Sequence, residues 1–135
     1  MKAALDGIRV IETASGMAGP MAGRLLADWG ADVIHVEPTI TGDMGREARR
    51  LLSDLYHRLP GGRNIETDFN YSYENHNCNK RSMTLDLSQK TGQEVLYRLA
   101  DKADIFLANF RPRELEKFNI SYEKLSQLNP RLIFA

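Results

Sequence analysis

The stretch from Gly7 to Gly30, GIRVIETASGMAGPMAGRLLADWG, decides the fold of this chain. It begins with a short apolar run, Ile8 to Ile11, that is typical of a buried parallel strand. Small residues and a Gly-Pro pair follow, and apolar residues then recur at helical spacing up to Trp29. A second apolar run, Val33 to Val36, ends in Glu37. This order of strand, glycine turn, helix and strand predicts a βαβ unit whose turn faces a ligand.

The glycine turn reads Ala14-x-Gly16-x-x-Gly19, which nearly matches the dinucleotide-binding fingerprint, with Ala14 in place of the first glycine. Gly16 would let the backbone approach a phosphate at the N-terminus of the helix, where free N–H groups favour an anion. Glu37 stands near the position where such an acid binds a ribose hydroxyl. The alternative is that both glycines serve only close packing of helix and strand, and the pattern alone leaves this open.

The composition is that of an ordinary globular protein, with 135 residues, 42% hydrophobic and 27% charged. Eighteen basic and eighteen acidic residues cancel, so no overall charge favours nucleic acid or an anionic membrane. The single cysteine, Cys78, excludes an internal disulfide, and no apolar run is long enough to span a membrane. We therefore expect a soluble, cytoplasmic protein that binds neither nucleic acid nor membrane. We expect no metal site, because one cysteine and scattered histidines make no ligand pattern.

The remaining sequence continues the alternation of strands and helices. We expect strands at residues 81–86, 103–108 and 132–134, and helices at residues 46–59, 114–118, 122–128 and after an N-cap at Ser88. The polar stretch 64–80 predicts an excursion with a short helix or turns. The fold class expected is α/β, a Rossmann-like open parallel sheet with helices on both faces, incomplete at the C-terminus. Such an unfinished sheet predicts poor solubility or self-association.

Two residues after the expected fourth strand are candidates for ligand binding. Asn109 and Phe110 fall at the carboxyl end of a strand, where open α/β sheets bind their ligands. The phenyl ring of Phe110 could stack on a base or pack into the core, and the pattern supports both interpretations.

Several ordered motifs resemble the class III coenzyme A transferases, the CaiB/BaiF-type family. The motifs are LDGIRVIE (5–12), AGP (18–20), LADWGADVIHVEP (26–38), NKRSMTLDL (79–87), ADIFLANFRP (103–112) and LNPRLIFA (128–135). The resemblance covers nearly the whole chain except about residues 45–75. It implies that residues 1–135 are the N-terminal part of a CoA-binding Rossmann-like domain, without the second domain and the rest of the sheet. It also implies an interlinked homodimer for the full-length protein.

The resemblance implies a CoA-transferase that moves CoA between an acyl-CoA and a small carboxylic acid. In the family an aspartate forms a mixed anhydride and then an aspartyl-CoA thioester, and this requires no metal. That aspartate lies beyond the strand matching Leu132 to Ala135, so we expect no catalytic residue in this chain and no activity from it alone. Asp86 and Asp104 match positions that flank strands and do not replace the nucleophile.

The family's contacts with coenzyme A transfer to positions along the whole chain. These are Met17, Ala18, Leu85, Ser88, Asn109, Phe110 and Lys117. The resemblance implies backbone contacts at the first two, an adenine-side contact at Leu85, and a phosphate contact at Lys117. The chain departs from the pattern at Pro38, where some members have an arginine, and at Ser88, where some have a lysine. Both departures would weaken the grip on CoA unless Arg46, Arg49 or Lys90 compensates.

Three other functions remain as alternatives. An acyl-CoA racemase or isomerase of the same superfamily would need a further acid/base residue outside this sequence. A stand-alone module could bind CoA or another nucleotide, or partner a second subunit, without catalysis. A nicotinamide dehydrogenase rests only on the glycine turn and Glu37, and the family motifs outweigh it.

Overall fold

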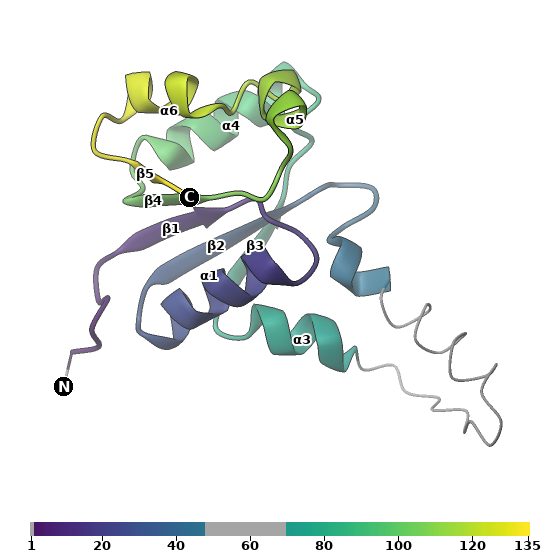
Figure 1. The fold of residues 1–135 in the computed structure, drawn as a ribbon, viewed down its shortest axis with the longest axis vertical. Coiled ribbons are helices and arrows are strands. Elements are labelled where there is room, and N and C mark those ends of the chain that lie inside the picture. Colours follow the sequence, from purple (N-terminus) through teal and green to yellow (C-terminus); the bar gives the residue numbers. More distant parts are fainter. Residues whose placement is uncertain (1, 48–69) are drawn as a thin grey trace, which may run out of the picture.

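A computed structural model describes residues 2–47 and 70–135 and shows one five-stranded sheet (Figure 1). All neighbouring strands are parallel, in the order β3-β2-β1-β4-β5. The strands are β1 (Arg9–Glu12), β2 (Asp32–Glu37), β3 (Arg81–Thr84), β4 (Ile105–Leu107) and β5 (Ile133–Phe134). This is the Rossmann-type strand order, and it confirms the α/β fold class predicted from the sequence.

Helices cover both faces of the sheet. They are α1 (Ala18–Asp28), α3 (Tyr71–Asn77), α4 (Lys90–Ala100), α5 (Pro112–Lys117) and α6 (Tyr122–Leu128). Figure 1 shows α1 and α3 below the sheet, and α4, α5 and α6 above it. Among the described residues, no helix is long and apolar enough to cross a membrane.

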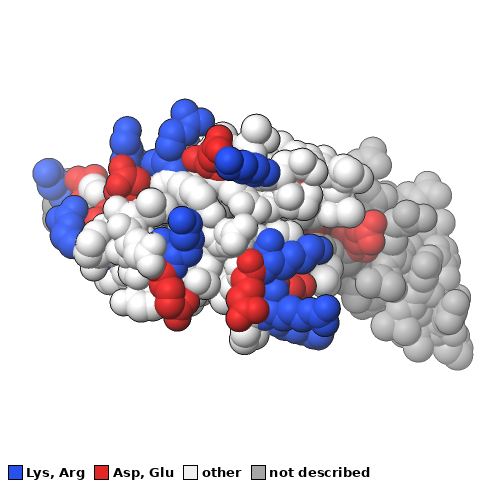
Figure 2. Space-filling view, turned by 90° about the horizontal axis from the view of Figure 1, so that it is seen from above, with Lys and Arg blue, Asp and Glu red and all other residues white. Residues whose placement is uncertain are grey.

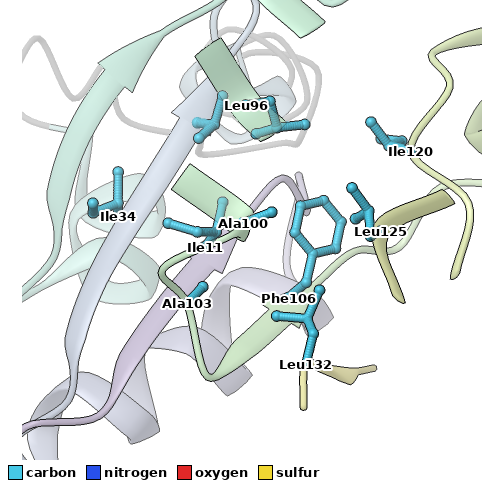
Figure 3. Close-up of a cluster of buried hydrophobic side chains, with 10 residues drawn as sticks. Ile11, Ile34, Leu96, Ala100, Ala103, Phe106, Ile120, Leu125 and Leu132 are labelled. Carbon is cyan, nitrogen blue, oxygen red and sulfur yellow. The ribbon is translucent and has the colours of Figure 1, made fainter. Parts of the chain in front are cut away.

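The alternation of side chains along each strand divides the core into two parts. Val10 and Val33 are paired in register and pack with Ala27 on the side of α1. Ile11 and Phe106 point to the opposite side. They meet a larger cluster from α4, α6 and the segments before and after α6, which Figure 3 shows around Leu96, Ala100, Ile120, Leu125 and Leu132. The β-branched and aromatic residues of the strands are therefore buried on both faces, as a parallel sheet requires.

Helix α4 has a different N-cap from the one predicted. The N-cap of α4 is Gln89, not Ser88. The prediction of a Ser88 cap was wrong because its hydroxyl and its N–H both donate to Asp86 Oδ1, at 2.6 and 3.0 Å, which forms a turn before the helix. The helix expected at residues 46–59 lies outside the described residues, apart from a helical turn at 44–47.

Candidate functional site

A cavity of about 750 Å³ lies at the carboxyl ends of the strands. Its walls come from the glycine turn after β1, the loop after β2, the segment after β3 and residues that follow β4. Strand order reverses between β1 and β4, where open α/β sheets form a crevice for ligands. The volume is in the range of small-molecule sites, about 300–1,000 Å³.

The cavity brings together some of the residues expected to bind coenzyme A. Leu85, Ser88, Phe110 and Lys117 line it. Met17, Ala18 and Asn109 are exposed and do not line it. Met17 and Ala18 belong to the glycine turn, and Asn109 is hydrogen-bonded to Ser15 of that turn, which does line the cavity. Apart from Pro38, the loop wall formed by Pro38 to Met44 was not singled out from the sequence.

Asn109 ties the two central strands together at their carboxyl ends. Its side-chain Oδ1 accepts the N–H of Ser15 at 3.0 Å, and its Nδ2 donates to the Ser15 carbonyl at 2.7 Å. These two bonds fix the turn after β1 against the turn after β4. Asn109 therefore shapes the wall that Ser15 contributes to the cavity.

One wall of the cavity is aromatic and carries a cation. Phe110 and Phe118 meet edge to face, with ring centroids 5.5 Å apart, and Lys117 Nζ lies 5.4 Å from the Phe118 ring centroid. Phe110 is half-buried, packs on the core cluster and also lines the cavity, so core packing is shown and stacking on a base stays a prediction. A flat apolar wall beside a cation suits a base with attached phosphates.

Charges on the described part of the cavity wall do not form a single-sign patch. Among the described lining residues Lys117 is the one cation, while the same wall carries the exposed Glu47 and the half-buried Asp86. Figure 2 shows basic and acidic side chains interleaved on the face that carries α4, α5 and α6. Lys117 is therefore the one cation that the described part of the wall offers to an anionic ligand.

The glycine turn is held by a carboxylate of the protein itself. Gly16 adopts φ +82°, which favours glycine, and its N–H donates to Asp43 Oδ1 at 3.3 Å. The same oxygen accepts the N–H of Gly45. The Gly16 amide, expected from the sequence to face a phosphate, is thus already bound to Asp43.

Glu37, the candidate ribose ligand, is buried and fully occupied by protein donors. Its carboxylate accepts two bonds from Arg46 and one each from Tyr73, Ser82 and the Asp43 N–H, all within 2.9 Å. Burial by itself raises the pKa of Glu37, but these donors outweigh it and lower the pKa to about 2. The Glu37 carboxylate therefore supports the loop. It is not available to bind a ribose hydroxyl, as the nicotinamide dehydrogenase alternative requires.

Beneath the cavity lies a buried ionic cluster formed by Glu12, His35, Asp43 and Lys80, each side chain no more than 1% exposed. His35 Nδ1 is 2.8 Å from Glu12 Oε1, and its Nε2 is 3.5 Å from Asp43 Oδ2. Lys80 Nζ is 2.8 Å from Glu12 Oε2. Burial lowers the pKa of His35, but Asp43 and Glu12 outweigh it and raise the pKa to about 9. The cluster thus sets two basic side chains, His35 and Lys80, against two acidic ones, Glu12 and Asp43.

Helix α1 fits over this cluster only because Gly23 carries no side chain. A Cβ at Gly23 would overlap the Glu12 carboxylate and approach Lys80 Nζ at 3.3 Å. Sequence reasoning did not find the cluster, because its members are far apart in the chain. Within the described residues, no group of three or more histidine, cysteine, aspartate or glutamate side chains is arranged to hold a metal ion.

Comparison with known proteins identifies the family. Residues 5–135 match the model of CoA-transferase family III. The chain belongs to this family. The ordered sequence motifs predicted this family, and the match confirms it.

The alignments with curated relatives extend over almost the whole chain. It is 42% identical to the succinyl-CoA–D-citramalate CoA-transferase of Chloroflexus aurantiacus over 96% of its length. It is 36% identical to the (R)-2-hydroxy-4-methylpentanoate CoA-transferase of Clostridioides difficile over 97% of its length. The crystal structure of Rv3272 from Mycobacterium tuberculosis superimposes with a TM-score of 0.79 at 33% identity, over 98% of this chain and 32% of that one. The chain spans about 30% of the length of the curated relatives it matches.

Proposed function

We propose that this chain is the CoA-binding N-terminal portion of an enzyme that transfers CoA from an acyl-CoA to a small carboxylic acid. The observation that carries the proposal is the match of residues 5–135 to CoA-transferase family III. In the full-length protein we expect two copies to form an interlinked homodimer.

The chemistry proposed uses an aspartate outside this sequence. Its carboxylate attacks the acyl-CoA thioester, which releases CoA thiolate and leaves an acyl-aspartyl anhydride. The thiolate then attacks the aspartyl carbonyl, which forms the aspartyl-CoA thioester and releases the first carboxylate. The acceptor carboxylate reverses these steps and leaves as the new acyl-CoA. The cavity described here serves to hold the CoA portion throughout.

The cavity wall fits coenzyme A in three respects. Phe110 offers a ring face for the adenine, and Lys117 offers a cation for a phosphate. The hydroxyl of Thr13, which is buried in the wall, has no hydrogen-bond partner within the described part of the chain. A buried hydroxyl without a partner is costly, so a polar atom of a ligand is its natural partner.

The test uses the protein purified from its native source, whose intact mass gives the length of the enzyme. It is incubated with a panel of acyl-CoA donors and free carboxylic acids, and new acyl-CoA species are separated by liquid chromatography. Formation of the acceptor's CoA ester supports transfer. Exchange of the α-hydrogen for deuterium without transfer supports the racemase alternative instead. Acyl-CoA binding without either reaction would support a non-catalytic module, and no binding would refute the proposal.

Replacing Lys117 with alanine should weaken acetyl-CoA binding by about 1.5–3 kcal/mol, the usual value of a hydrogen bond to a charged group. Lys117 is the one cation on the described cavity wall. The measurement is the dissociation constant from isothermal titration calorimetry. The matched control is Lys124→Ala, which removes a lysine near the Tyr97 ring, outside the cavity. Equal affinities for both variants would show that Lys117 does not contact the ligand.

Replacing Phe110 with alanine should weaken acetyl-CoA binding by about 1–3 kcal/mol, as loss of a stacked base does. Because Phe110 also packs on Phe118, stability must be measured on the same samples by urea unfolding. Phe110→Leu is the control that retains most of the apolar packing while it removes the ring. A leucine variant with wild-type affinity would refute stacking at this position.

A further inference from the structure

The buried ionic cluster connects the sheet with two of the cavity walls. Asp43 accepts the N–H groups of Gly16 in the glycine turn and of Gly45 at the end of the loop after β2. His35 lies on β2, and its two ring nitrogens face Asp43 on one side and Glu12 of β1 on the other. His35 thus contacts the Asp43 carboxylate that holds both segments, while Glu37, also on β2, accepts the backbone N–H of Asp43.

We propose that His35 is a positioning residue for the acyl-CoA site: through Asp43 it holds the glycine turn (13–17) and the loop 38–45 in the shape that forms two walls of the cavity. This inference rests on the proposed function, because it assumes that the cavity binds an acyl-CoA. His35 does not line the cavity. It acts on the ligand through the two backbone segments that Asp43 binds.

The role requires a cation at this position. A neutral imidazole has one N–H and one lone pair, so one of its nitrogens would face a carboxylate without a proton between them. A protonated ring places a positive charge between Glu12 and Asp43, whose carboxylate oxygens lie 2.8 and 3.5 Å from its two nitrogens. Loss of that proton would leave the Asp43 carboxylate buried without its cation, which is costly, and Asp43 would then release the turn and the loop.

The charged groups around the ring are Glu12 of β1, Asp43 of the loop and Lys80, which precedes β3. Helix α1 faces Glu12 with Gly23, which has no side chain. The pKa of His35 is raised from 6.5 to about 9 in this surrounding. Its stabilising contribution is therefore complete below pH 6.5 and is lost as the pH rises through about 9.

The experiment measures acetyl-CoA affinity between pH 7.5 and 10 for the wild type, His35→Gln, His35→Lys and His76→Gln. Acetyl-CoA is chosen because it has no free thiol to titrate. His76 is a buried histidine of α3 outside the cavity wall, so His76→Gln is the matched control for the same substitution.

We expect the wild type and His76→Gln to lose affinity as the pH rises through about 9. If deprotonation of His35 leaves about a tenth of the molecules with ordered cavity walls, the affinity for acetyl-CoA falls about tenfold. His35→Gln should bind about tenfold more weakly at pH 7.5 and show a flat profile. His35→Lys keeps a cation and should restore acetyl-CoA binding at pH 7.5. The pH at which this variant loses affinity should be higher than for the wild type by at least about one pH unit. Wild-type affinity and pH dependence in His35→Gln would overturn the proposal.

A ligand-free measurement separates failure of this inference from failure of the proposed function. Hydrogen exchange of the Gly16, Asp43 and Gly45 amides should be faster in His35→Gln than in His76→Gln, and close to wild type in His35→Lys. If the wild type does not bind acetyl-CoA, the proposed function fails while the exchange result still decides the role of His35. Unchanged exchange in a folded His35→Gln would overturn that role. If His35→Gln does not fold, the comparison of His35→Lys with the wild type decides by the same criteria.

Discussion

Replacing Lys80 with methionine is expected to lower the free energy of unfolding by about 3–5 kcal/mol, the cost of removing one partner from a buried ion pair. Lys80 Nζ donates to Glu12 Oε1, to the Pro20 carbonyl and to Asn77 Oδ1, at 2.7–3.0 Å. Methionine has a similar length but no donor, so Glu12 would keep only His35 as a cationic partner. Urea unfolding followed by circular dichroism measures the change as a shift of the midpoint at constant slope.

Two further variants control this prediction. Lys90→Met changes an exposed lysine at the start of α4, and we expect an effect within about 0.5 kcal/mol. The double variant Glu12→Gln with Lys80→Met removes both charges of the pair and should recover part of the loss, because no carboxylate is then left without its lysine. A Lys80→Met protein as stable as Lys90→Met would show that the buried pair contributes nothing to stability.

The fold was predictable because local pattern and final environment agree in the strands and helices. Val33 and Ile34 belong to a β-branched run, and the structure buries them on opposite faces of the sheet. The helix expected at residues 122–128 is α6 (Tyr122–Leu128). Ser88 is not the N-cap because its N–H and its hydroxyl both donate to Asp86 Oδ1, which places it in a turn before the helix. A propensity scale does not include such a local side-chain turn.

The candidate site was only partly predictable. Phe110 was identified by its position after a strand, and topology alone brings such residues to one edge of the sheet. The buried ionic cluster has no such local signal. Glu12 and Lys80 are separated by 68 positions, and each looks like an ordinary charged residue in its own segment. Their partnership follows from β3 lying beside β2, which only the completed sheet order reveals.

The second large effect concerns the core on the opposite face of the sheet. Replacing Phe106 with alanine should lower the free energy of unfolding by about 3–5 kcal/mol, as expected for removal of a buried aromatic ring. Phe106 is fully buried, pairs in register with Phe134 and stacks on its ring at 5.4 Å. The space left in the core would remove the contacts between β4 and β5 on one side and α4 and α6 on the other, because side chains of these elements surround the ring.

The matched control for this change is Ile133→Ala, which also removes a large side chain from the β4–β5 pair. Ile133 is 60% exposed, so we expect a loss within about 0.5 kcal/mol. Phe106 does not line the cavity, and folded Phe106→Ala should therefore bind acetyl-CoA nearly as well as the wild type. A variant that loses affinity but not stability would contradict both expectations, because it would mean that Phe106 acts on the ligand site and that the core tolerates its absence.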